Sequence, residues 1–184
     1  MPRWLYYLLI MAIVAPIINL VWGEQFQAGV DVLTDLIAKQ PNAAEAYIRL
    51  AEAYRKMGHP ELEAHALAKL ARMKPDFPMI HVLTAQAMLT MDPVDYPKVL
   101  TELAAAEKIA PSDPDVFYLR GKALAATKRF REAATALKRA TELRPMDPNA
   151  YYQLGLTYQR MGETTLAHET LERLRYIRQI ATPP

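Results

Sequence analysis

Apolar residues recur at every third or fourth position along most of the chain, with charged and polar residues between them. In the run 130–143, FREAATALKRATEL, the alanines and leucines fall at helical spacing and the charged residues lie between them. This spacing is typical of amphipathic helices that bury one face. The pattern therefore predicts an all-α fold.

Prolines divide this pattern at regular intervals. Pro41 and Pro75 are 34 residues apart, Pro75 and Pro111 are 36 apart, and Pro111 and Pro145 are 34 apart. Because proline cannot continue a helix, each one marks a boundary. The two extra residues of the second interval fit in the proline-rich turn 91–97, since loops accept insertions at little cost.

Each interval is predicted to hold two helices. In the third interval, the first helix runs over about 114–127 and the second over about 130–143. Asp113 stands before a proline, which combines a favourable N-cap with a favourable first helical residue. Asp147 repeats this signal before the next unit.

The same residue types stand at matching places in the four units. The fourth unit carries Tyr151, Leu154, Gly155, Tyr158, Gly162, Ala167 and Leu171. The third carries Phe117, Gly121, Leu124, Phe130, Ala133, Leu137, Ala140 and Pro145. The first carries Tyr47, Leu50, Ala51, Tyr54, Gly58, Ala64 and Pro75, and the degenerate second has His81, Thr84, Ala85 and Met88.

These motifs resemble the tetratricopeptide repeat family. The resemblance implies a right-handed α-solenoid of helix-turn-helix repeats over 42–181, divided into 42–75, 76–111, 112–145 and 146–181. It also implies that Gly121 and Gly155 mark the closest approach of the two helices in a unit. Ala133 and Ala167 are the expected small residues opposite them.

The N-terminal stretch 4–22, WLYYLLIMAIVAPIINLVW, is apolar and carries no charge. At about 1.5 Å per residue, a helix of this length reaches just under the roughly 30 Å core of a bilayer. Trp4 and Trp22 at its ends are typical of membrane interfaces. We therefore predict a transmembrane anchor over 1–22. A cleaved signal peptide and a buried globular helix are the two alternatives, although Pro16 after the best cleavage site disfavours processing.

Charge around this stretch predicts its orientation. Arg3 precedes it, whereas Glu24 and Asp31 follow it. The positive-inside rule then places the repeats outside the cytoplasm. The expected location is a bacterial inner membrane, with a single pass and periplasmic repeats. Absence of cysteine is compatible with that compartment.

A half-repeat is predicted between the anchor and the first full unit, over 23–41. Phe26 and Gly29 match Phe130 and Ala133 in spacing, so this segment reads as a second helix without a soluble first helix. It would join the anchor directly to the repeats. Residues 182–184 form a short tail.

The family resemblance implies that partners bind a concave face lined by the first helix of each unit. The residues carried over to this face are Ile48, Glu52, Met79, Val82, Gln86, Leu89, Tyr118, Lys122, Tyr152 and Leu156. Most of them are apolar, which is typical of a groove for a peptide or helix. Alternatively, they pack between units or against another subunit.

The third unit is rich in basic residues, which read either as a solvated face or as a contact for an acidic partner or anionic lipid. They are Lys122, Lys128, Arg129, Arg131, Lys138, Arg139 and Arg144. Over the whole chain the net charge is only +2, so nucleic acid is not an expected partner.

No catalytic or cofactor-binding pattern is found. The histidines form no close ligand pair with a carboxylate, so no metal site is predicted; they are His59, His65, His81 and His168. His81 takes an aromatic slot and reads as a packing residue. The chain has no cysteine, no glycine-rich phosphate loop and a single serine, Ser112. We therefore expect no enzyme activity and no cofactor.

The function predicted from the sequence is that of a membrane-anchored scaffold or adaptor that binds proteins. It would serve as an assembly factor or accessory subunit of a membrane protein complex. The alternative is a purely structural subunit of a stable membrane complex of the respiratory or photosynthetic type. The kinds of complex named here rest on family analogy.

Overall fold

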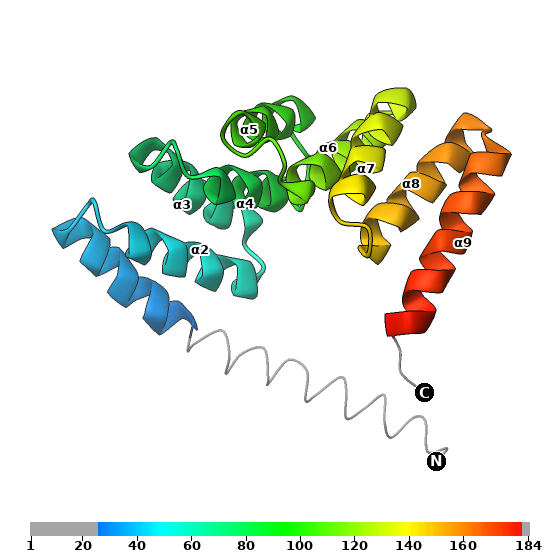
Figure 1. Ribbon diagram of the computed structural model, residues 1–184. Helices are drawn as coiled ribbons and strands as arrows, with labels where there is room; N and C mark the ends of the chain where they lie inside the picture. The colour runs from blue at the N-terminus through cyan, green and yellow to red at the C-terminus, as the bar shows by residue number, and fades with distance from the viewer. Residues whose placement is uncertain (1–25, 182–184) are drawn as a thin grey trace, which may run out of the picture. The chain divides into compact units, whose positions relative to one another are not determined.

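The computed structural model describes residues 26–181, which are helical apart from short turns (Figure 1). No strand occurs in this range. The chain divides into two compact units, 1–73 and 74–184, and each is described by itself.

The first unit contains a helix over 26–39, followed by α2 (Ala44–Met57) and α3 (Pro60–Met73). Helices α2 and α3 pack on each other as a hairpin. Gly58 ends α2 in the left-handed conformation, with φ of 75°, and its N–H donates to the Arg55 carbonyl. Glycine adopts this conformation without a steric penalty, which explains its place in the turn.

One charged side chain is buried in this hairpin. Glu63 on α3 is only 7% exposed, and its Oε1 lies 4.0 Å from Nε of Arg55 on α2. Burial raises the pKa of Glu63, and the positive charge of Arg55 opposes that shift.

The second unit is a run of six helices. They are α4 (Pro78–Met88), α5 (Tyr96–Ile109), α6 (Pro114–Ala126), α7 (Phe130–Leu143), α8 (Pro148–Met161) and α9 (Thr164–Ala181). Each helix packs on the next one in the chain, and α6 also contacts both α4 and α8 (Figure 1). The first helices of the pairs, α4, α6 and α8, therefore lie in a row.

The predicted helix starts are confirmed in this unit. Asp113 accepts a hydrogen bond from the N–H of Asp115 at 2.9 Å, and Asp147 accepts one from the N–H of Asn149 at 2.9 Å. Both carboxylates satisfy N–H groups that a helix start leaves unpaired. Asp95 caps α5 in a similar way, which was not predicted from the sequence.

The close approach expected at the two helical glycines is confirmed, but the facing residue is different. A Cβ on Gly121 would lie 2.4 Å from Leu137 Cγ, and a Cβ on Gly155 would lie 2.7 Å from Leu171 Cδ2. Leucine, one turn beyond the expected Ala133, fills the space that glycine leaves. In each of these two repeats, the leucine side chain of the second helix therefore packs directly on the glycine backbone of the first helix.

Three sequence predictions fall at the ends of the chain. The predicted anchor 1–22 and the tail 182–184 lie outside the described residues. Among the helices described within 26–181, none has both the length and the apolar character needed to cross a membrane. The half-repeat region is helical over 26–39, but Gly29 faces open space, whereas its predicted counterpart Ala133 is fully buried.

Candidate partner-binding groove

A groove of about 190 Å³ lies between α6 and α8. Helix α6 contributes Lys122, Ala125 and Ala126, and helix α8 contributes Gln153, Leu156, Thr157 and Arg160. These positions are three or four residues apart on each helix, so each set lies on one helical face. Because α6 and α8 are first helices of neighbouring pairs, the groove lies on the face that the repeat pattern assigns to partners.

The groove exists because its two walls differ in size. Two small residues, Ala125 and Ala126, stand on α6 opposite the larger Leu156 on α8. Thr157 is only 2% exposed, and its hydroxyl donates to the Gln153 carbonyl within the helix. The floor is therefore mainly apolar.

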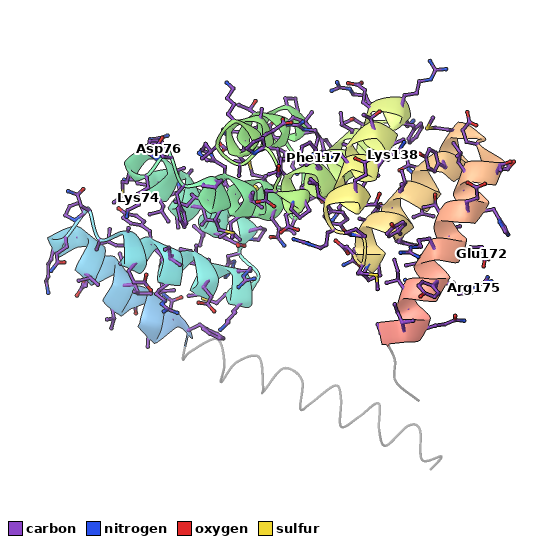
Figure 2. The ribbon with its side chains drawn as sticks, viewed as in Figure 1. Lys74, Asp76, Phe117, Lys138, Glu172 and Arg175 are labelled. Carbon is purple, nitrogen blue, oxygen red and sulfur yellow. The ribbon has the colours of Figure 1, made fainter. Side chains whose placement is uncertain are left out.

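Two cations line the groove without a carboxylate partner in the described part of the chain. Lys122 Nζ lies 5.7 Å from the centre of the Tyr118 ring, and Arg160 Cζ lies 5.9 Å from the centre of the Phe130 ring. Five arginines of this unit do pair with carboxylates; they are Arg120, Arg129, Arg139, Arg144 and Arg175. Arg175, for example, lies 2.8 Å from Glu172 on α9 (Figure 2). The groove consequently carries positive charge that no neighbouring acid cancels.

Two tyrosines lie on the same face, one turn before the groove on α6 and α8. Tyr118 is half-buried against two apolar clusters of α6, α7 and α8, and Tyr152 is 43% exposed. Burial raises the pKa of Tyr118, and the carboxylates of Asp147 and Asp115 raise it further. The Tyr118 phenol is thus neutral near pH 7.

The acidic groups at this end are already engaged. Arg144 Nη1 lies 2.7 Å from Asp115 Oδ1 and 3.6 Å from Asp147 Oδ2. This arginine, at the end of α7, joins the first turn of α6 to the N-cap of α8. The uncompensated charge of the face therefore lies at its Lys122 end.

The predicted partner-binding residues fall into three groups. Lys122 and Leu156 line the groove, while Tyr118 and Tyr152 stand one turn before them on α6 and α8. On α4 and its C-cap, Met79 and Gln86 are exposed and Leu89 is half-buried.

Val82 is not accessible to a partner, in contrast to the prediction. The sequence places it at the same helical position as Tyr118 and Tyr152, but it is only 5% exposed. A short aliphatic side chain gains by leaving water and does not reach past its neighbours as a tyrosine does. Val82 therefore belongs to the core in this structure.

Ile48 and Glu52 belong to the first unit. Ile48 is 39% exposed on α2. Glu52 Oε1 lies 3.2 Å from Lys56 Nζ one turn later, and hydrogen bonding to Lys56 lowers the pKa of Glu52. Both side chains are accessible within that unit.

Sequence reasoning missed five residues of the groove. They are Ala125, Ala126, Gln153, Thr157 and Arg160. The predicted face on α8 followed Tyr152 and Leu156. Arg160 stands four residues beyond Leu156, so extending that spacing by one more turn would have found it.

A larger depression of about 520 Å³ lies over α6 and α7, but its charged residues are all paired. Arg120 pairs with Glu107, Glu132 with Arg129, and Arg139 with Glu142. Its apolar floor is at most 9% exposed. It offers a partner less uncompensated charge than the α6–α8 groove does.

The described residues offer no group of three or more acidic or histidine side chains that could hold a metal ion. His81, the residue in the aromatic slot, is half-buried between α4 and α5. Its Nδ1 lies 2.8 Å from Glu102 Oε2, and its Nε2 lies 3.3 Å from the Pro75 carbonyl oxygen. These contacts fit a packing role.

Two protein-family models match the sequence. A model described as "TPR repeat" matches residues 121–162, and one described as "Tetratricopeptide repeat" matches 44–77 and 148–178. A comparison with curated proteins finds no match.

Solved structures with a similar fold include several of MamA. One crystal structure of MamA has a TM-score of 0.79 and 17% identity, covering 86% of this chain and 92% of that chain. MamA 41-end from Desulfovibrio magneticus RS-1 has a TM-score of 0.76 and 17% identity, with 90% and 97% covered. YrrB, titled a TPR protein with an unusual peptide-binding site, has a TM-score of 0.71 and 18% identity, with 85% and 79% covered. These likenesses establish the all-helical repeat fold.

Proposed function

Because the chain is a tetratricopeptide-repeat protein, we propose that it is a scaffold that holds a partner by a peptide segment in the α6–α8 groove. One observation carries this proposal: the groove combines an apolar floor with two cations that no neighbouring acid neutralises. Partner sites commonly join an apolar centre to a polar or charged rim.

The likeness to YrrB supports the peptide part of the proposal. That protein shares the fold and is titled as having a peptide-binding site. A peptide is also a suitable ligand on physical grounds. A groove between two helices is long and narrow, so an extended or helical segment fills it better than a flat protein surface does.

We further propose that the scaffold works at a membrane. Residues 4–22 are uncharged and apolar, and Arg3 precedes them. A bacterial inner-membrane anchor with periplasmic repeats follows from this pattern. The test is protease treatment of intact spheroplasts. Digestion of the repeats supports the proposal, and protection until the cells are lysed contradicts it.

Within this proposal the chain is an assembly factor or accessory subunit of a membrane complex. A purely structural subunit is the second candidate, favoured by exposed apolar residues outside the groove. Tyr176 and Ile180 on α9 are 50% and 51% exposed. A structural subunit would bury these side chains permanently against a neighbour.

Photo-crosslinking tests the groove directly and separates the two candidates. The photoreactive residue p-benzoylphenylalanine replaces Tyr152 beside the groove or, as a matched control, the similarly exposed Tyr176 on α9. A scaffold predicts one discrete crosslinked protein from Tyr152 and none from Tyr176. Crosslinks from both positions to subunits that stay stoichiometric through detergent purification indicate the structural alternative. Absence of any crosslink at Tyr152 contradicts the groove proposal.

A further inference from the structure

We infer that the α6–α8 groove selects a peptide segment in which an acidic side chain stands next to an apolar one. This inference rests on the proposed function and names the chemistry of its ligand. The ligand class follows from the charges, the floor and the free hydrogen-bonding groups of the groove.

The charge argument begins with Lys122 and Arg160. Both are accessible, and neither forms an ion pair with any described carboxylate, although most arginines of this unit do. A carboxylate placed beside either cation would accept charge-assisted hydrogen bonds, which are stronger than neutral ones. It would also be favoured over a neutral or basic group by simple Coulomb attraction.

The acids at the N-terminal end of this face do not supply that carboxylate. Asp115 and Asp147 lie at the opposite end, where Arg144 binds both. Lys122 stands seven residues after Asp115 along α6, which is about 10 Å at 1.5 Å per residue. Because exposed charges at such a separation are screened by salt, the carboxylates leave the basic end available.

The apolar residues and the glutamine of the groove indicate the other chemical groups that the ligand carries. Leu156 and Ala126 present apolar atoms beside the cations, so an apolar side chain of the ligand is buried there. The side-chain amide of Gln153 forms no hydrogen bond within the described residues and can pair with a peptide backbone. An acidic residue adjacent to an apolar one satisfies all three features.

The experiment selects peptides without assuming a partner. The full chain in mild detergent is panned against a displayed library of random peptides of about 12 residues, and the bound peptides are sequenced. We expect Asp and Glu to be enriched beside a Leu, Ile, Phe or Met, relative to the input library. The most enriched peptide is then synthesised with an acetylated N-terminus and an amidated C-terminus, and its affinity is measured by fluorescence polarisation.

Two variants with the same charge change provide the decisive comparison. The groove variant is Lys122→Gln with Arg160→Gln. The control is Arg131→Gln with Lys138→Gln; both of these side chains are exposed on α7, and Lys138 is labelled in Figure 2. The groove variant should bind at least about tenfold more weakly, as expected for loss of a charge-assisted hydrogen bond. The control should change affinity by less than about twofold, and both should keep the wild-type helical content.

Each other outcome has a defined meaning. If no peptide is enriched, the proposed function fails and the inference fails with it. If enriched peptides lack acids but lose binding to Leu156→Asp, the groove function stands and the inference is overturned. Equal affinity for the groove variant and the control also overturns it. Loss of binding on C-terminal amidation overturns the assignment to an acidic side chain.

Discussion

Substitution of Gly121 by alanine tests the contact that joins the two helices of a pair. The new Cβ would lie 2.4 Å from Leu137 Cγ, closer than real Cβ atoms come to their neighbours. Leu137 is fully buried, so its side chain cannot turn out of the way into solvent. Overpacking of this kind costs about 1–3 kcal/mol, while alanine in a helix recovers about 1 kcal/mol relative to glycine. We expect a net loss of up to about 2 kcal/mol in the free energy of unfolding.

Two other glycines calibrate this expectation. At Gly155 the new Cβ would meet the end of Leu171 at 2.7 Å, and Leu171 is only half-buried, so its side chain can move aside. The loss for Gly155→Ala should therefore be smaller, about 0–1 kcal/mol. Gly29 lies in the helix over 26–39, and a Cβ added there would meet nothing within 4 Å. Gly29→Ala should stabilise the chain by about 0.5–1 kcal/mol through helix propensity alone.

The assay is urea unfolding of the three variants, followed by circular dichroism at 222 nm. For a chain of this size, each kcal/mol corresponds to roughly 2–4 °C in melting temperature. A double-mutant cycle adds Leu137→Ala to Gly121→Ala, and the two losses should be less than additive because the smaller side chain removes the clash. If Gly121→Ala stabilises the protein as much as Gly29→Ala does, the proposed close contact is wrong.

Two further substitutions test charged groups. Glu63→Gln should raise the free energy of unfolding at pH 7. Because burial raises the pKa of Glu63, the folded wild-type protein binds this proton more tightly than the unfolded chain does. Wild-type stability therefore falls as the pH rises from about 4.5 through the folded-state pKa, and glutamine avoids this loss. The advantage of the variant in urea unfolding should shrink at pH 4, and a pH-independent loss would mean that the pairing with Arg55 dominates. Asp147→Ala should lower the free energy of unfolding by about 1 kcal/mol because α8 loses its N-cap hydrogen bond from the N–H of Asn149. Asp76→Ala is the exposed control. An unchanged melting temperature for Asp147→Ala would show that water replaces the cap without loss.

Local signals made most of the fold predictable. The helix predicted over about 114–127 ends one residue earlier, and the one over 130–143 has the predicted bounds. Proline after aspartate marks a helix start through the conformation of two adjacent residues, so it needs no knowledge of the rest of the chain. The right-handed twist of the whole array and the membrane anchor stay predictions.

The groove was less predictable because it depends on helix phase and on side-chain size. Lys122 and Leu156 followed from the repeat register, whereas Gln153 and Thr157 required knowing how far α8 turns against α6. Val82 shows the same limit, since burial depends on neighbouring helices and not on its place in a motif.

Ion pairs between distant positions were not predictable either. Arg144 and Asp115 are 29 residues apart in the chain, and only the folded pairing of helices brings them together. Pairing of this kind also decides which cations remain free to meet a partner, so the charge of a surface cannot be read by counting basic residues.

The arrangement of charge along the α6–α8 face has a consequence for geometry. Helices α6 and α8 both run antiparallel to α7 and so point the same way, with Tyr118 and Tyr152 nearer their starts and Lys122 and Arg160 nearer their ends. A peptide lying along these two helices would contact neutral aromatic side chains at one end and positively charged side chains at the other. Reversing that peptide would set its negative group against phenol rings. The proposed peptide would therefore bind in a single direction, which sets the side of the groove from which the rest of the partner continues.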